Sequence, residues 1–307
     1  MNHVFGPVPS RRLGRSLGVD LVPFKTCTFD CIYCQLGPTT VKTAERREWL
    51  CRDEVLEEIR RKLEPRPDYI TFSGSGEPTL HTGLDEWIEA IRSITDVPIA
   101  VLTNGSLLWR PEVRRELLQA DLAIPSLDAG DAETFRRVNR PCDTISFEQM
   151  VDGLIAFREE FAGRYWLEVL LLSGYTSDEA AVKKIAAHAG RIRPDRIQLN
   201  TATRPPADSL VEPVPHEQLV RLAGLFEPAA EVIADFDHPA PDAGLGANNE
   251  DILTLLRRRP CTHPDVAAAL GLHRNEVLKC LDVLIDRGLV TRTPRGPAIY
   301  YRAARPE

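Results

Sequence analysis

The stretch "KTCTFDCIYCQLG", residues 25–37, places Cys27, Cys31 and Cys34 within eight positions, and no fourth cysteine stands near them. Three thiolates at this spacing can hold an iron–sulfur cluster and leave one iron open to a further ligand. A structural zinc site is the alternative interpretation. Such sites usually combine paired CxxC units or add histidine, and no histidine lies between residues 4 and 80. The spacing therefore favours an iron–sulfur cluster.

Six apolar, β-branched runs alternate with amphipathic stretches along the first two thirds of the chain. In the amphipathic stretch 53–64, Val55, Ile59 and Leu63 recur at helical spacing. Short apolar strands that alternate with helices form βαβ units and a parallel sheet. We therefore predict an α/β fold, either a partial (β/α)6 barrel or a doubly wound sheet. The runs are "LGVDLVPF" (17–24), "YITFSG" (69–74), "PIAVLTNG" (98–105), "DLAIPSLDA" (121–129), "WLEVLLLSG" (166–174) and "RIQLNTA" (196–202).

Polar side chains gather where these predicted strands end. Active sites of parallel α/β folds lie at the carboxyl ends of the strands, so we expect these side chains to bind a ligand. Glu168 is the most informative, because a carboxylate inside an apolar run is costly to bury without a partner. The others are also common turn formers, as in Asn104-Gly105. The candidates are Asn104, Ser126, Asp128, Glu168 and Asn200.

The character of the chain changes after residue 205. A proline-rich segment leads into a predicted helix over 215–226, and "HPAPDAGLGANN", residues 238–249, predicts a linker. Three helical patterns then precede a hairpin around Pro294-Arg295-Gly296, an order that is typical of a winged helix-turn-helix. We therefore predict an N-terminal arm (1–17), a barrel (18–237), the linker (238–249) and a winged helix-turn-helix domain (250–307).

The cysteine motif and its surroundings resemble the radical SAM superfamily. In that family an aromatic residue precedes the last cysteine, as Tyr33 does here, and a glycine-rich turn follows the second strand, as "FSGSGEP" (72–78) does here. The resemblance covers residues 18 to about 204 and implies an enzyme with a partial TIM barrel of the radical SAM type. It also implies a 4Fe–4S cluster on the three cysteines and S-adenosylmethionine (SAM) on the open iron. A flavodoxin-like or ferredoxin-like protein would supply one electron.

The same resemblance implies SAM contacts for the motif residues. Tyr33 would lie against the adenine, and Gly74, Ser75 and Gly76 would let the backbone approach the methionine ammonium. Glu77 would pair with the charge of that ammonium. The polar residues at the strand ends would bond the ribose hydroxyls and the methionine carboxylate. Simple core packing of Tyr33 and a plain strand-to-helix turn at 73–78 are the alternatives.

More narrowly, several stretches are similar to the wyosine-synthase-like branch of the superfamily, whose tRNA-acting members rebuild a methylguanosine. This resemblance implies a tRNA or another nucleic acid as substrate, and a peptide or a small metabolite stays open. Cleavage of SAM to 5′-deoxyadenosine and methionine is the expected outcome. The stretches are "FGPVPSRRLGRSLGVDLVPFKTC", "CIYCQLG", "TFSGSGEPTL", "VLTNGSLL", "IPSLDA" and "QLNTATRPP".

Basic residues near the predicted mouth of the barrel are candidates for substrate binding. Arg11, Arg12 and Arg15 fall in one glycine-containing segment, and guanidinium groups suit phosphate or carboxylate. Lys25 precedes the first cysteine by two residues, and Arg204 follows the last predicted strand. A solvated loop is the alternative interpretation of the arginine-rich segment.

The predicted winged helix-turn-helix domain is basic. From Glu250 onward, ten Lys/Arg stand against seven Asp/Glu, so the local charge is +3 and the rest of the −7 chain carries −10. Basic residues at exposed positions of the recognition helix and wing predict contact with nucleic acid. Contact with a protein or peptide and packing against the barrel are the alternatives. The basic residues are Arg274, Lys279, Arg292, Arg295 and Arg302, and the polar Asn275 lies among them on the predicted recognition helix.

Composition sets the remaining expectations. The 307 residues are 27% charged and 43% hydrophobic, as in ordinary globular proteins. We find no apolar signal segment and no run of about 18 apolar residues, so we expect a cytoplasmic location. There, the seven cysteines favour metal binding over disulfides. A redox-sensing transcription regulator is the rival to an enzyme, but it would need neither the glycine-rich turn nor the polar strand ends.

Overall fold

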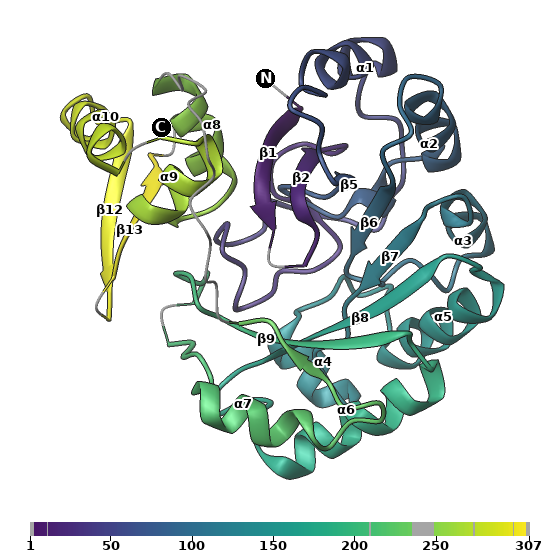
Figure 1. The fold of residues 1–307 in the computed structure, drawn as a ribbon. Helices are drawn as coiled ribbons and strands as arrows, with labels where there is room; N and C mark the ends of the chain where they lie inside the picture. Colours follow the sequence, from purple (N-terminus) through teal and green to yellow (C-terminus); the bar gives the residue numbers. More distant parts are fainter. Residues whose placement is uncertain are drawn as a thin grey trace.

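The computed structural model of this chain contains an eight-stranded main sheet (Figure 1). Strand β1 runs antiparallel to β2, and the other neighbours in the sheet are parallel. The parallel strands β2 and β5 to β9, with helices on their outer side, confirm the predicted partial (β/α)6 barrel. In sheet order the strands are β1 (Val4–Ser10), β2 (Gly14–Val19), β5 (Tyr69–Phe72), β6 (Ile99–Thr103), β7 (Leu122–Pro125), β8 (Arg164–Leu171), β9 (Arg196–Thr201) and β10 (Glu231–Val232).

The structure describes residues 3–10, 12–208, 210–234, 249–272, 274–296 and 298–304. Arg11 and nearly all of the predicted linker (238–249) lie outside the described residues. The backbone of the third helix of the C-terminal domain is described, but the side chains of Asn275 and Lys279 are not.

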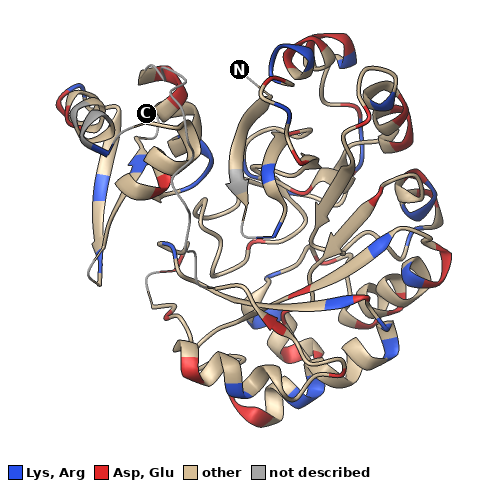
Figure 2. Ribbon diagram, in the orientation of Figure 1, with Lys and Arg blue, Asp and Glu red and all other residues tan. Residues whose placement is uncertain are grey.

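Seven α-helices accompany the main sheet within the described residues. Their amphipathic patterns place apolar side chains against the sheet, as Val55 and Ile59 show in α1, while acidic and basic residues mark the outer faces (Figure 2). Among the described residues, no helix has both the length and the apolar character needed to cross a bilayer. The helices are α1 (Arg52–Arg61), α2 (Leu84–Arg92), α3 (Pro111–Leu117), α4 (Ala132–Val138), α5 (Phe147–Glu160), α6 (Glu179–Ile192) and α7 (His216–Ala223).

Two parts of the barrel differ from the sequence expectation. The predicted arm (1–17) contains β1 and most of β2, and both strands pair into the main sheet. Polar positions of β2 are satisfied inside the sheet, because the Ser16 Oγ lies 2.6 Å from the Thr71 Oγ1 of β5. Helix α4 was not expected, since it is only seven residues long and buries just Phe135 and Val138.

The hydrophobic residues form two main cores. The larger core lies between the main sheet and its helices and includes Ile59, Ile70 and Trp87, each with at most 1% of its surface exposed. Burying a side chain of this size contributes about 2 kcal/mol. A separate core fills the C-terminal domain, with Ile252, Leu256, Val266, Leu281 and Val290 among its members. The boundaries between the predicted domains stay a prediction.

The C-terminal domain has the winged helix-turn-helix order that the sequence predicts. Thr262 and Asp265 form a capping box at the start of the second helix, and Gly271 ends that helix in a left-handed conformation. The small sheet has the order β11-β13-β12, and β12 with β13 forms the wing. The elements are α8 (Asn249–Arg258), β11 (Cys261–Thr262), α9 (His263–Leu270), α10 (Arg274–Asp286), β12 (Val290–Arg295) and β13 (Ala298–Ala303).

The C-terminal domain packs against the edge of the main sheet. Helices α8 and α9 contact β1 (Figure 1), and Val8 of that strand packs against the smaller core. The Arg258 guanidinium lies 3.9 Å from the ring centre of Phe5. An uncovered edge strand offers unpaired backbone groups to other chains, and here the second domain covers it. The same packing places α8 beside the carboxyl ends of the barrel strands.

Candidate active site

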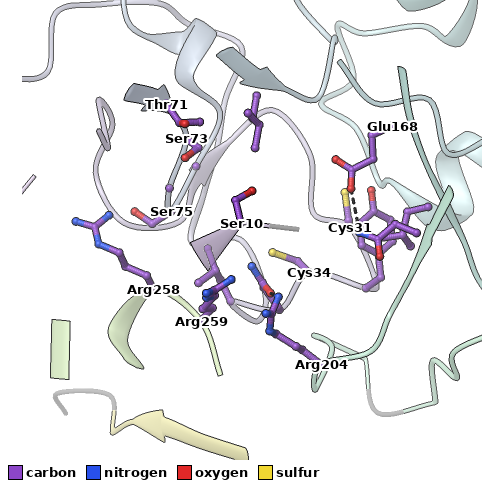
Figure 3. Close-up of a pocket in the computed structure, with 18 of the residues that line it drawn as sticks. Ser10, Cys31, Cys34, Thr71, Ser73, Ser75, Glu168, Arg204, Arg258 and Arg259 are labelled. Carbon is purple, nitrogen blue, oxygen red and sulfur yellow. Dashed lines mark hydrogen bonds between the residues drawn. The ribbon is translucent and has the colours of Figure 1, made fainter. Parts of the chain in front are cut away.

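A cavity of about 450 Å³ lies at the carboxyl ends of the barrel strands (Figure 3). The thiols of Cys27, Cys31 and Cys34, all from the cluster loop (residues 25–37), line its wall. Leu255 of α8 lines it from the C-terminal domain. This space, called the central cavity below, is thus bounded by both domains.

Each of the three sulfurs receives at least one N–H donor from the protein. The Lys25 Nζ lies 3.1 Å from the Cys34 Sγ. The Asn104 Nδ2 lies 3.5 Å from the Cys27 Sγ, and an amide nitrogen of Asn139 lies 3.6 Å from the Cys31 Sγ. Such donors stabilise negative charge on sulfur and tune the reduction potential of iron–sulfur clusters.

Burial favours the neutral thiol form of Cys27 and Cys31 in the metal-free site. Burial and the nearby Glu77 carboxylate raise the pKa of the Cys27 thiol to about 12, and burial raises the pKa of Cys31 well above its usual range. A bound cation displaces such protons, because the thiolate is the ligand. Three sulfurs with N–H donors, facing a cavity with room for a fourth ligand, fit a 4Fe–4S cluster with one open iron.

The glycine-rich turn (residues 73–78) packs directly on the cluster loop. The Lys25 N–H donates to the Ser75 carbonyl at 2.8 Å, and the Glu77 N–H donates to the Thr26 carbonyl at 3.1 Å. A Cβ on Gly76 would lie 2.0 Å from the Thr26 carbonyl oxygen, so only glycine permits this approach. Gly74, Ser75 and Gly76 all line the central cavity. The turn therefore joins the sulfur-bearing wall to the rest of the site.

Glu77 lies behind the turn and does not line the central cavity. Its carboxylate accepts hydrogen bonds from the Thr79 N–H at 3.0 Å, the Thr103 hydroxyl at 2.6 Å and the Asn104 N–H at 2.7 Å. Burial raises the pKa of this carboxyl. These bonds tie the turn to the end of β6, so Glu77 holds the turn and Asn104 in place.

A second buried carboxylate holds the ring of Tyr33, which lines the central cavity. The Tyr33 hydroxyl donates to Asp128, and an amide nitrogen of Asn139 lies 3.1 Å from the same carboxylate oxygen. The other oxygen accepts the Leu170 N–H at 2.9 Å. Burial raises the pKa of Asp128 to about 6. Asp128 thus positions both an aromatic wall and the amide that serves Cys31.

Glu168 has the partners that its place on an apolar strand requires. The Arg12 guanidinium lies 2.9 Å from one carboxylate oxygen, and the Asn200 Nδ2 lies 3.0 Å from the other. Glu168, Asn200 and Arg12 all line the central cavity. Ser126 does not line it, although its backbone forms a bridge to Glu168 of the neighbouring strand.

The structure brings six of the ten predicted SAM-contacting residues to the cavity wall. Tyr33, Gly74, Ser75, Gly76, Glu168 and Asn200 line the central cavity. The other four are Glu77, Asn104, Ser126 and Asp128, and they lie behind that wall. Asn104 bonds Cys27 and Asp128 bonds Tyr33, both of which reach it, whereas Glu77 acts one step further back by bonding Asn104.

The predicted substrate residues are divided in the same way. Arg12, Lys25 and Arg204 line the central cavity, and Arg204 lies 3.2 Å from the Gln35 Oε1. Arg15 does not line it, because it is exposed beside Asp68 and donates to the Arg66 carbonyl.

Sequence reasoning missed a carboxylate that joins the two domains. Asp20 accepts the Ser75 N–H at 3.1 Å and the Ser75 hydroxyl, and the same oxygen pairs with the Arg258 guanidinium at 2.9 Å. A Cβ on Gly74 would lie 2.5 Å from the Asp20 Cγ, which explains the glycine. The available signal was an acidic residue inside the apolar run "LGVDLVPF". That signal is of the same kind as the one that identified Glu168.

Part of the wing contacts the barrel, and the rest of it faces solvent. The Tyr300 hydroxyl donates to the Thr203 carbonyl at 2.8 Å, and the Arg302 guanidinium donates to the Gln35 carbonyl. The Arg295 guanidinium donates to the Arg204 carbonyl and, at 3.1 Å, to the Val211 carbonyl. The sequence predicts phosphate contact for Arg295, and in the structure its guanidinium is directed to the barrel instead, where two of its nitrogens donate to carbonyls.

Family comparisons agree with the two domains of this description. The profile of the Radical SAM superfamily matches residues 21–185, more than half of the chain, including the cysteine motif and the glycine-rich turn. The profile of the sugar-specific transcriptional regulator TrmB matches residues 250–307. The C-terminal unit is thus a TrmB-type winged-helix domain.

Two curated relatives share most of this chain. A UPF0026 protein of Helicobacter pylori strain 26695 is 31% identical over 306 residues, which are 98% of this chain and 97% of that protein. The GTPase Obg of Brachyspira hyodysenteriae is 40% identical over 294 residues, which are 94% of this chain. This chain spans only 43% of the length of that second protein.

A solved structure shares the fold. The radical SAM methyltransferase from Sphaerobacter thermophilus matches with a TM-score of 0.52 and 17% identity. The match covers 71% of this chain and 65% of that protein. At this identity the likeness concerns the α/β barrel architecture alone.

Proposed function

This chain belongs to the Radical SAM superfamily, and from that premise we propose that it modifies a substrate in the central cavity by SAM-derived radical chemistry. The superfamily uses a 4Fe–4S cluster and SAM. One observation carries the assignment of the site. Cys27, Cys31 and Cys34 line one cavity, each with an N–H donor on its sulfur, and the glycine-rich turn adjoins them. This arrangement supports an enzyme over a redox-sensing regulator.

When bound, the cluster and SAM together supply reductive cleavage of a carbon–sulfur bond. The protein's own part is orientation and charge control. Lys25, Asn104 and Asn139 donate to the three sulfurs and so stabilise added negative charge. Lys25 is the strongest of the three, because it is a cation at 3.1 Å from the Cys34 sulfur.

The remaining residues shape the SAM site. We assign direct SAM contact to the residues that line the central cavity, namely Tyr33, residues 74–76 of the glycine-rich turn, Glu168 and Asn200. Positioning falls to Glu77 and Asp128, whose carboxylates hold the turn and the Tyr33 ring from behind. The buried Glu77 carboxylate is engaged by the three hydrogen bonds described above, so it acts through the turn.

The surroundings of the central cavity bear on the substrate. The wyosine-synthase-like stretches imply a tRNA nucleoside, and the names of the relatives specify no substrate of this chain. Tyr300 and Arg302 of the wing bond barrel loops beside the central cavity. A folded nucleic acid would have to pass these contacts to reach the cavity. We therefore favour a small molecule over a macromolecule. A flavodoxin-like or ferredoxin-like donor in the cytoplasm would supply the electron.

Anaerobic reconstitution tests this function. The full chain is loaded with iron and sulfide, reduced with dithionite and incubated with SAM, and the products are identified by mass spectrometry. We expect 5′-deoxyadenosine and methionine. Methylthioadenosine as the main product would reassign the broken bond, and no cleavage by protein that holds its cluster would contradict the enzyme.

A further inference from the structure

The lining of the central cavity has a charge opposite to that of the chain. Its basic side chains are Arg12, Lys25, Arg204, Arg258 and Arg259, against the single acidic residue Glu168. The chain as a whole carries −7. A concave, partly buried surface of one sign concentrates ligands of the opposite sign.

Local partners account for some of these cations. Arg12 pairs with Glu168, and Arg258 pairs with Asp20 just behind the lining, each at 2.9 Å. Lys25 donates to the Cys34 sulfur. Arg259 differs, because within the described parts of the chain its guanidinium has no ion pair, and the side-chain partner that it meets is the buried thiol of Cys261. Arg259 is only partly exposed, so water compensates its charge incompletely.

Arg204 approaches the same part of the cavity from the other domain. Figure 3 shows the side chains of Arg204 and Arg259 directed toward the region beside Cys34. Interdomain bonds lie next to both side chains. Arg295 donates to the Arg204 carbonyl, and Arg258, the neighbour of Arg259, is held by Asp20. Two guanidinium groups from separate domains are thus directed toward one part of the cavity.

We propose that Arg204 and Arg259 form an anion-binding subsite for a phosphate or carboxylate group of a small-molecule substrate. The inference rests on the proposed function and specifies the substrate class. Guanidinium groups bind such anions with paired hydrogen bonds. A cavity of about 450 Å³ between two bonded domains suits a small molecule. The winged-helix domain therefore completes the active site by contributing Arg259.

Binding of simple anions tests the subsite. Titration calorimetry measures inorganic phosphate, and succinate in parallel, with the cluster-loaded full chain in saturating SAM at constant ionic strength. We expect R259Q to weaken binding of at least one probe by about tenfold, as loss of a charge-assisted contact predicts. R204Q should act in the same direction. The control is R257Q, because Arg257 lies only two residues earlier, is exposed on α8 and pairs with Glu250.

The outcomes separate this inference from the proposed function. The subsite is wrong if neither probe binds at millimolar concentration, or if R259Q and R257Q bind them alike while circular dichroism shows both variants folded. SAM cleavage is measured on the same samples. Normal cleavage without anion binding leaves the proposed function intact, and Arg259-dependent binding without cleavage contradicts that function alone. If bulk tRNA displaces the probe from the parent protein, and this competition is lost in R259Q, the assignment of a small-molecule substrate is wrong.

Discussion

The two walls of the central cavity are held by different kinds of contact. On the sulfur-bearing wall, the cluster loop and the glycine-rich turn exchange backbone hydrogen bonds, as between Lys25 and Ser75. On the opposite wall, the winged-helix domain has its own core and reaches the barrel largely through side chains, as Tyr300 does to Thr203. The first wall is therefore part of the barrel fold, whereas the second depends on docking.

Asp20 links these two walls. One of its carboxylate oxygens accepts from Ser75 in the glycine-rich turn and also pairs with Arg258 of α8. Any movement of the winged-helix domain would therefore change the environment of the glycine-rich turn. Substitutions on the sulfur-bearing wall should prevent binding of the cluster. Substitutions on the docked wall should weaken binding of SAM or substrate while the cluster stays bound.

The largest expected effect lies on the sulfur-bearing wall. Cys31→Ala removes one of three cluster ligands, so we expect roughly tenfold less iron after anaerobic reconstitution. Iron and sulfide analysis with the visible absorption spectrum measures this loss. Cys51→Ala is the control, since Cys51 is exposed and does not line the cavity. Full iron content in the Cys31 variant would exclude these three cysteines as the ligand set.

The second expected effect concerns docking. Asp20→Asn leaves Arg258 without its carboxylate partner at a place where the two side chains are only 9% and 12% exposed. Removing one member of such a pair costs about 3 kcal/mol. Urea unfolding should show this loss together with weaker SAM binding, while the iron content stays normal.

A surface pair supplies the control for that docking test. Asp131→Asn removes a charge that pairs with Lys184, where the side chains are 35% and 58% exposed. The cost there should stay below about 1 kcal/mol. Equal effects of the two variants would show that the Asp20 contact does not join the walls.

The sulfur-bearing wall was also the more predictable one. Cysteine spacing, Tyr33 and the alternating runs are local patterns, and the predicted barrel and cavity wall followed from them. Glu168 was found because an acidic residue in an apolar strand needs a partner, which proved to be Arg12. Asn139 was missed because it lies 108 residues from Cys31 and only the fold brings the two together.

The docked wall was poorly predictable for a physical reason. Helical periodicity and turn chemistry identify a winged helix, but they do not show which of its surfaces meets another domain. Arg295 looks like a phosphate ligand in the sequence and instead donates to backbone carbonyls of the barrel. Arg259 lies at the end of the arginine run 257–259, and the sequence does not distinguish it from Arg257, which is exposed.

A smaller effect should appear in the pH dependence of stability. Burial raises the pKa of Asp128 from 3.8 to about 6, so the folded state binds more protons than the unfolded state between those values. Stability supplied by the protonated carboxyl is therefore lost as pH rises through about 6. Relative to Asp128→Asn, the parent should lose about 1 kcal/mol between about pH 5 and about pH 7.

Chemical unfolding of the metal-free protein at the two pH values measures this difference. Asp131→Asn is again the control, because hydrogen bonding to Lys184 lowers the pKa of Asp131 to about 2, below this window. Its stability difference from the parent should not change with pH. An Asp128 difference that is likewise constant would mean that the carboxyl is ionised throughout.

The smallest effect separates two arginines of the wing. Arg292 is exposed, whereas Arg295 is bonded to the barrel. If the winged-helix domain binds DNA, each lost phosphate contact should flatten the dependence of log K on log salt by about one unit. We expect that change for Arg292→Ala, with SAM cleavage unaffected.

Arg295→Ala should leave the slope unchanged and instead weaken anion binding in the central cavity, because it releases the backbone that positions Arg204. Fluorescence anisotropy with a labelled duplex measures the slopes, and the reverse pattern would place Arg295 on the nucleic-acid surface.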